Sequence, residues 1–155
     1  MRFLVIGAPE AGKSTVAKAL ASELGCECAN TSDAIVRAEI DRRALLREYG
    51  IEIPEFVKAR DRPYLIALGN VLTDANSSCL IDIAFSEGQI ITGVRRLHEF
   101  ESLEDDVIVI KVTRPGFDAT DNYELMGVSA HIDIINNGTE ADLLKAVEGI
   151  SCGYR

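Results

Sequence analysis

The stretch FLVIGAPEAGKSTVAKAL, residues 3–20, contains an apolar run, a loop bounded by two glycines, and apolar positions with helical spacing. Gly7 and Gly12 enclose four residues, and Lys13 and Ser14 follow directly. This is the P-loop pattern: Gly, any four residues, Gly, Lys, and then Ser or Thr. Because the pattern lies between a predicted strand and a predicted helix, as its mechanism requires, we interpret it as a phosphate-binding loop.

The residue types of this loop suit a bound polyphosphate. Glycines let the backbone turn tightly around an anion, and a helix N-terminus adds free N–H groups and a positive dipole end. Lys13 is expected to reach the β- and γ-phosphates of ATP, Ser14 to bind Mg²⁺ and Thr15 to donate to the α-phosphate. The predicted nucleotide-binding residues here are Gly7, Ala8, Pro9, Glu10, Ala11, Gly12, Lys13, Ser14 and Thr15.

Short apolar segments alternate with longer stretches of helical periodicity along the rest of the chain. This alternation predicts one α/β domain, a three-layer α/β/α P-loop NTPase fold with a central parallel sheet and a short lid. The strands are expected at residues 2–6, 26–29, 89–92, 107–113 and 131–135. The helices are expected at residues 12–24, 32–49, 54–71, 74–85, 97–103 and 139–149. Residues 32–85 are predicted to be an acceptor-binding helical region, and residues 114–130 the lid.

Composition restricts the class of protein. The chain has 155 residues, of which 47% are hydrophobic and 26% charged, as in a globular domain with one core. Its net charge of −9 opposes binding to nucleic acid. No apolar run approaches the roughly 20 residues that cross a membrane, so we expect a cytoplasmic protein. The Asp-x-x-Gly and Asn-Lys-x-Asp motifs of GTP-binding switches are absent, which leaves mainly the small P-loop kinases.

Arginines occur where a phosphate acceptor would need them. A kinase that phosphorylates a monophosphate must bring two anions together, so it needs cations; a hydroxyl acceptor would need a carboxylate base instead. Several arginines follow expected strands at the sheet edge where such folds bind ligands, or lie in the expected acceptor-binding helices. The candidates are Arg37, Arg62, Arg95, Arg96 and Arg114.

Three further stretches extend this pattern. They are RPYLIALGN (residues 62–70), IITGVRRLHEFESL (residues 90–103) and HIDIINNGTEADLLKAV (residues 131–147). With the P-loop, they resemble the deoxynucleoside monophosphate kinases found largely in bacteriophages, which are relatives of adenylate kinase and dephospho-coenzyme A kinase. The resemblance covers most of the chain.

The resemblance implies roles for several residues. Arg95 matches the turn arginine that holds the substrate phosphate, Arg114 the arginine at the entrance of the lid, and Asp33 the acid that begins the acceptor-binding helix. DNYE, residues 121–124, is similar to an acidic lid motif or is a solvated acidic loop. The adenine is expected to contact mainly the backbone of Asn136, Asn137 and Gly138.

One position departs from the family pattern. Relatives commonly place an Asp two residues before the turn arginine, where this chain has Gly93. Asp33 or Asp82 would then substitute for that acid, or activity would be reduced.

The sequence therefore predicts a kinase that transfers the γ-phosphoryl group of ATP, with Mg²⁺, to a (deoxy)nucleoside 5′-monophosphate, with Lys13, Arg95 and Arg114 as catalytic residues. Two alternatives stay open. One is another small-molecule kinase, with dephospho-coenzyme A or a sugar as acceptor, and the other is a nucleotide-binding regulator without catalysis. A homodimer is expected only by analogy with the relatives.

Overall fold

The computed structural model describes residues 1–117 and 123–154. Parallel strands form a five-stranded sheet in the order β2-β3-β1-β4-β5. The sheet consists of β1 (Arg2–Ile6), β2 (Cys28–Asn30), β3 (Ile90–Thr92), β4 (Val107–Thr113) and β5 (Ile132–Ile135). The predicted parallel sheet is confirmed, and β1 and β4 have the predicted bounds. Since all the strands are parallel, the loops that follow them meet at one edge of the sheet.

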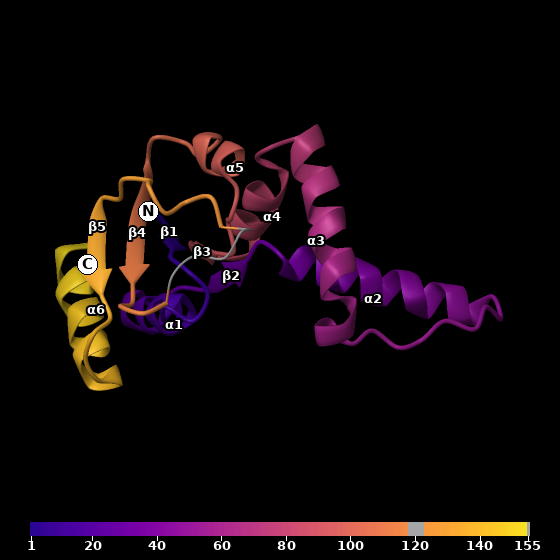
Figure 1. Cartoon of the computed structure of the whole chain (residues 1–155), viewed down its shortest axis with the longest axis horizontal. Helices are drawn as coiled ribbons and strands as arrows, with labels where there is room; N and C mark the ends of the chain where they lie inside the picture. The colour runs from indigo at the N-terminus through magenta and orange to yellow at the C-terminus, as the bar shows by residue number, and fades with distance from the viewer. Residues whose placement is uncertain (118–122, 155) are drawn as a thin grey trace.

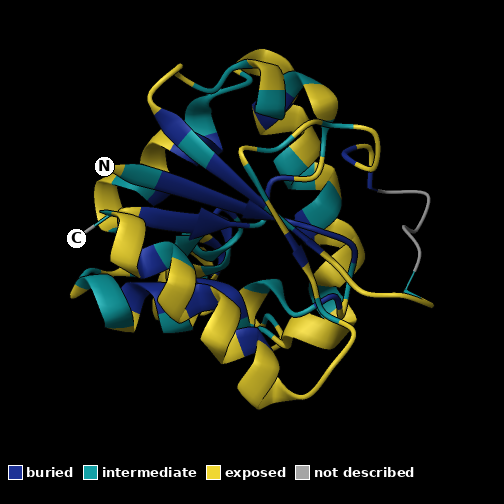
Figure 2. Cartoon of the chain, turned by 90° about the vertical axis from the view of Figure 1, so that its left-hand side faces the viewer, coloured by how far each residue is buried: buried dark blue, intermediate teal, exposed yellow. Residues whose placement is uncertain are grey.

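Helices cover both faces of the sheet, which confirms the three-layer fold (Figures 1 and 2). Alternate residues of β1 point to opposite faces. Phe3 and Val5 pack in one core cluster with residues of α1 and α6, and Leu4 and Ile6 pack in another with residues of α4. The helices are α1 (Lys13–Leu24), α2 (Asp33–Glu48), α3 (Lys58–Ala75), α4 (Cys79–Glu87), α5 (Leu97–Glu101) and α6 (Glu140–Tyr154).

Helices α2 and α3, with the loop that joins them, extend away from the sheet (Figure 1). We call residues 33–75 the arm. Ile35 and Leu65 of the arm form a small core cluster with Leu80 of α4. Within the described residues, the structure contains no helix of the length and apolarity needed to cross a membrane.

Two predicted helix bounds in the arm are wrong. The helix expected from residue 54 begins at Lys58, where the Asp61 carboxylate accepts a hydrogen bond from the Val57 N–H at 2.9 Å. The break expected near residues 72–73 lies instead at residues 76–78. There the Asn76 side chain accepts the N–H of Ser78 at 3.2 Å, a local turn that ends α3.

Candidate active site

The P-loop joins β1 to α1, and both of its glycines are required by close packing. A Cβ atom at Gly7 would lie 2.2 Å from the Val112 carbonyl oxygen of β4. Gly12 has φ of +105°, and a Cβ atom there would lie 2.8 Å from Asn136 Nδ2. A side chain fits at neither position, so the loop backbone lies directly against the ends of β4 and β5.

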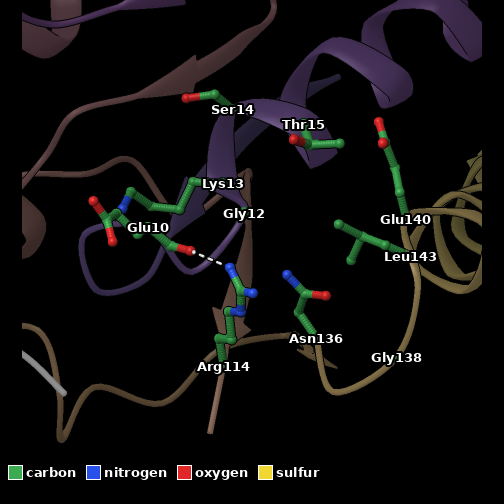
Figure 3. A pocket seen from close by; sticks show the side chains of 10 residues that line it. All are labelled: Glu10, Gly12, Lys13, Ser14, Thr15, Arg114, Asn136, Gly138, Glu140 and Leu143. Atoms are coloured by element: carbon green, nitrogen blue, oxygen red, sulfur yellow. Dashed lines mark hydrogen bonds between the residues drawn. The ribbon is translucent and has the colours of Figure 1, made fainter. Parts of the chain in front are cut away.

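A cavity of about 460 Å³ opens beside this loop (Figure 3), and we call it the P-loop cavity. Residues from α1, from the ends of β4 and β5, and from α6 line it. These lining residues are Glu10, Gly12, Lys13, Ser14, Thr15, Arg114, Asn136, Gly138, Glu140 and Leu143. The structure thus brings most of the predicted nucleotide-binding residues together. Gly7, Ala8 and Ala11 are buried behind the cavity surface, and Asn137 is exposed.

Three side chains donate to the P-loop backbone, one from the loop motif itself and two from distant segments. Lys13 Nζ donates to the Ala8 carbonyl at 2.6 Å, and Asn136 Nδ2 donates to the Ala11 carbonyl at 2.9 Å. Arg114 Nη1 donates to the Glu10 carbonyl at 3.4 Å (Figure 3), and its guanidinium lies 4.2 Å from the centre of the Phe117 ring. The cations at this cavity therefore bond to carbonyl groups, and an incoming phosphate would compete for them.

A second cavity, of about 600 Å³, lies between the arm and the carboxyl ends of β2 and β3. We call it the arm cavity. Its charged lining residues are the cations Lys58, Arg62 and Arg95 and the acid Glu99. Its large apolar lining residues are Ile35, Leu65, Ile66 and Leu80. One cavity thus combines positive charge with a broad apolar wall.

Electrostatic effects link the two cavities. The pKa of Lys13 is lowered because burial disfavours its charged form and because Arg95 lies within electrostatic range. The pKa of Arg95 is lowered in turn by desolvation and then by the charge of Arg62, while Glu99 opposes this shift. Lys13 of the P-loop cavity is therefore within electrostatic range of Arg95 of the arm cavity, and Arg95 is within range of Arg62 of the same cavity; we call these three cations the cation row.

Glu99 is the one carboxylate among the described residues that line the arm cavity. Its side chain is buried, and its Oε2 atom accepts the backbone N–H groups of Arg95 at 3.4 Å and of Arg96 at 3.1 Å. These bonds fix the turn before α5. Glu99 was not identified from the sequence. It lies three residues after Arg96, the N-cap residue of α5, and an acid at this spacing from the N-cap is a recognisable capping signal.

The packing around Gly93 leaves no room for the acid that the sequence lacks at this position. Gly93 has φ of +103°, and a Cβ atom there would lie 2.5 Å from Thr31 Oγ1 and 2.6 Å from Asn30 Oδ1. No acid fits in this backbone. Asn30 and Thr31 line the arm cavity at this point, and both were missed in the sequence. Their position directly after a predicted strand, at the binding edge of the sheet, was the available signal.

Three predicted acceptor residues, Asp33, Arg37 and Arg96, are not among the described residues that line either cavity. Arg37 forms an ion pair with Glu87 of α4, and Arg96 pairs with Asp74 at 3.0 Å. Their binding roles stay predictions without support from this arrangement. Asp82, the other suggested substitute acid, accepts a hydrogen bond from Ser78 at 2.7 Å. Asp121 of the predicted lid motif lies outside the described residues.

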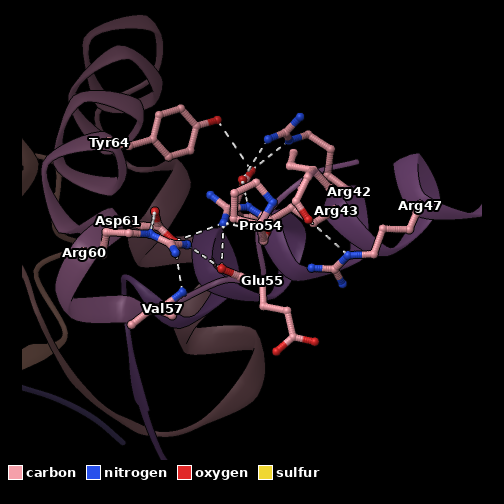
Figure 4. A network of polar contacts seen from close by, with 11 residues as sticks. Arg42, Arg43, Arg47, Pro54, Glu55, Val57, Arg60, Asp61 and Tyr64 are labelled. Carbon is pink, nitrogen blue, oxygen red and sulfur yellow. Dashed lines mark hydrogen bonds and ion pairs between the residues drawn. The ribbon is translucent and has the colours of Figure 1, made fainter. Parts of the chain in front are cut away.

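A network of charged side chains supports the arm (Figure 4). Arg43 Nε donates to Glu39 Oε1 at 2.7 Å, and Arg43 Nη1 donates to Asp61 Oδ2 at 3.1 Å. Hydrogen bonds from Arg42 and then Arg43 lower the pKa of Glu39 to about 2. Hydrogen bonds from Arg60 and then from the Val57 N–H hold the pKa of Asp61 below its ordinary value.

This network fixes the end of α3 that carries two cavity cations. Arg43 also donates to the carbonyl groups of Pro54 and Glu55, each at 3.2 Å, so it ties the loop of the arm to α2. Lys58 and Arg62 follow within the next turns and line the arm cavity. The buried ion pairs therefore set where these two cations stand.

Comparisons with known proteins bear on the fold. No family model and no curated protein matches the sequence. The structure is similar to that of shikimate kinase from Aquifex aeolicus vf5, with a TM-score of 0.55, 16% identity and coverage of 99% of both chains. The chain therefore shares the three-layer α/β fold of that structure.

Two more solved structures resemble this fold less closely. A gluconokinase from Sinorhizobium meliloti 1021 gives a TM-score of 0.48 at 14% identity, over 99% of this chain and 92% of that one. A sugar kinase from Janibacter sp. HTCC2649 gives 0.45 at 17% identity, over 96% and 92%.

Proposed function

We propose that the protein is an ATP-dependent kinase that phosphorylates a (deoxy)nucleoside 5′-monophosphate to the diphosphate. The observation that carries this proposal is the placement of the cation row, with Lys13 in the lining of the P-loop cavity and Arg95 and Arg62 in the lining of the arm cavity. Like charges held this close repel one another, and the repulsion is relieved when anions bind between them. A phosphoryl transfer between two phosphates brings such anions to both sides of Arg95.

The P-loop cavity would hold the nucleotide donor. Lys13 would exchange its bond to the Ala8 carbonyl for the β- and γ-phosphates, and Arg114 would neutralise charge at the other side of the cavity. The exposed hydroxyl of Ser14 lines the same cavity and suits Mg²⁺, a cation that prefers oxygen ligands and few protein groups. When bound, Mg²⁺ would offset the negative charge of the phosphates.

The arm cavity would hold the acceptor. Arg62 and Arg95 would bind the acceptor phosphate, and the apolar wall that includes Ile35 and Leu65 would contact the nucleoside. A phosphate oxygen is already anionic at neutral pH, so its attack needs no general base. Position and charge neutralisation by these side chains are therefore sufficient for the transfer.

A hydroxyl acceptor, such as a sugar or a hydroxy acid, fits the arm cavity less well. Such an acceptor needs a carboxylate base, and Glu99, the one carboxylate among the described lining residues, already holds the turn before α5 through its Oε2 atom. The packing around Gly93 also leaves no room for an acid in the adjacent turn.

Release of ADP tests the proposal directly. The protein would be incubated with MgATP and, separately, with each common ribo- and deoxyribonucleoside monophosphate, shikimate, gluconate and dephospho-coenzyme A. We expect ADP release that depends on at least one nucleoside monophosphate and that falls sharply in R95A. Release that depends only on a hydroxyl acceptor, or ATP binding without release on any acceptor, would contradict it.

A further inference from the structure

Tyr123, Glu124 and Leu125 form a short segment that contacts the turn carrying Arg95 and lies near Gly7 of the P-loop. Leu125 is fully buried and Tyr123 is 9% exposed, and both belong to the core cluster that contains Leu4 and Ile6. The Tyr123 hydroxyl lies near the backbone of Gly7, with no partner at hydrogen-bond distance among the described residues. The segment is therefore anchored in the core beside the P-loop.

Between these two anchors, Glu124 is bonded to three consecutive residues of the turn that precedes α5. Its backbone N–H donates to the Arg95 carbonyl at 3.0 Å. Its Oε2 atom accepts the Leu97 N–H at 2.8 Å, and its Oε1 atom lies 4.0 Å from Arg96 Nε. Glu99 holds the same turn from inside the helix. Residues 95–97 are thus held by two carboxylates from different segments: Glu99 accepts the Arg95 and Arg96 N–H groups, and Glu124 accepts the N–H of Leu97, the first residue of α5.

Electrostatic repulsion would displace the Arg95 side chain if its turn were not held in place. Its guanidinium lines the arm cavity with Arg62, and the positive charges of Arg62 and of Lys13 both lie within electrostatic range of it. A long side chain under repulsion on a mobile turn would move toward solvent, because doing so lowers the repulsion and raises its conformational entropy. A fixed turn restricts this movement and reduces the entropy lost when a phosphate binds.

We propose that Glu124 is a positioning residue that holds the Arg95 turn in the orientation that faces the acceptor phosphate. This role rests on the proposed function for its consequence in catalysis. Glu124 acts through Arg95 and does not itself touch the substrate. Glu124 also connects the segment anchored beside the P-loop to the acceptor side of the site, so the two halves share one support.

The test compares E124A and E124Q with E101A. Glu101 is an exposed acid at the end of α5 and has no hydrogen bond or ion pair to other described residues, so E101A removes an equal charge without touching the Arg95 turn. We expect E124A to raise the KM for the acceptor roughly tenfold, the loss that follows removal of a charge-assisted hydrogen bond. E124Q should recover much of this affinity because its amide oxygen can still accept the Leu97 N–H. ATP affinity should change less than about twofold in all three variants.

A double variant separates positioning from general weakening. If Glu124 acts through Arg95, E124A should have no further effect on acceptor KM once R95A is present. Equal and additive losses from R95A and E124A would overturn the proposal, as would a loss of similar size in E101A.

NMR relaxation of the Arg95 Nε–Hε group gives a readout that does not depend on activity. E124A should increase the fast motion of this group, and E101A should leave it unchanged. Increased motion in a protein that phosphorylates no nucleoside monophosphate would refute the proposed function and leave the positioning role intact. Unchanged motion in E124A would refute the positioning role, whatever the activity.

Discussion

The two halves of the candidate active site are built in different ways. The P-loop cavity is built on one continuous stretch, the P-loop and the start of α1, whose glycines allow contact with β4 and with the residue after β5; residues after β4 and β5 and from α6 complete its lining. The arm cavity takes its chemistry from side chains of four separate segments, and their positions depend on packing in the arm. A local backbone site can be recognised from a short motif, whereas a side-chain site assembled at long range cannot.

The largest effect is expected for Lys13, which lines the P-loop cavity and is within electrostatic range of Arg95 of the arm cavity. K13A should lower kcat by about 10²–10³, because removal of one donor to a developing phosphate charge has that effect in other enzymes. Its fold should be retained, since the side chain makes one hydrogen bond within its own loop. ADP release and circular dichroism would be measured on the same sample. A fall of less than about tenfold would contradict the role of the cation row.

Loss of the charged network in the arm should lower the free energy of unfolding and weaken binding of the acceptor. E39Q leaves Arg42 and Arg43 without their shared carboxylate, and breaking such a buried pair costs about 3–5 kcal/mol in free energy of unfolding. Urea unfolding would measure this loss. E48Q is the control, because Glu48 is an exposed acid of the same helix. Acceptor affinity should fall more than ATP affinity.

The pH dependence of E39Q has a defined sign. The folded pKa of Glu39, about 2, lies below its ordinary value of 4.5, so ionised Glu39 stabilises the fold above about pH 4.5. That contribution is lost as the pH falls from about 4.5 toward 2. The stability difference between wild type and E39Q should therefore shrink over this range. A difference that stays constant down to the lower limit would show that Glu39 acts by packing alone.

Two arginine variants test whether the folded structure, rather than position in the sequence, decides which arginines bind the acceptor. R62A should raise the acceptor KM about tenfold to hundredfold, the equivalent of roughly 1.5–3 kcal/mol for a charge-assisted contact. R37A should change it less than about twofold, because Arg37 pairs with Glu87 and does not line the cavity. Steady-state kinetics at saturating ATP would measure both. A larger rise in acceptor KM for R37A than for R62A would contradict this account and support the acceptor-binding role that the sequence predicted for Arg37.

The fold and the P-loop half were predictable, and the acceptor half was predictable only in part. The bounds of β1 and β4 follow from nearly continuous apolar runs, and the P-loop from a motif of fixed spacing. Arg62 and Arg95 were found by their position near predicted elements. Arg37 and Arg96 had equally suitable positions in the sequence, but nearby acids pair with them elsewhere. Such long-range pairing leaves no local pattern.

The contacts around Gly93 and Glu124 could not be predicted from the sequence for the same reason. The space beside Gly93 is filled by side chains from the end of β2, a segment about 60 residues earlier in the chain, as the Asn30 to Thr92 hydrogen bond shows. Glu124 contacts the Arg95 turn from a segment that follows the next strand. Only the folded chain brings these groups together.

Calorimetric titration with a bisubstrate analogue, in which two nucleosides are joined through their 5′ positions by a polyphosphate chain, tests the central claim most directly. If the cation row connects a donor site to an acceptor site, this compound should bind about 10²–10⁴ times more tightly than ATP or a nucleoside monophosphate alone, and R95A should abolish most of the gain. Affinity equal to that of ATP alone, unchanged in R95A, would contradict the claim that one continuous site holds both anions.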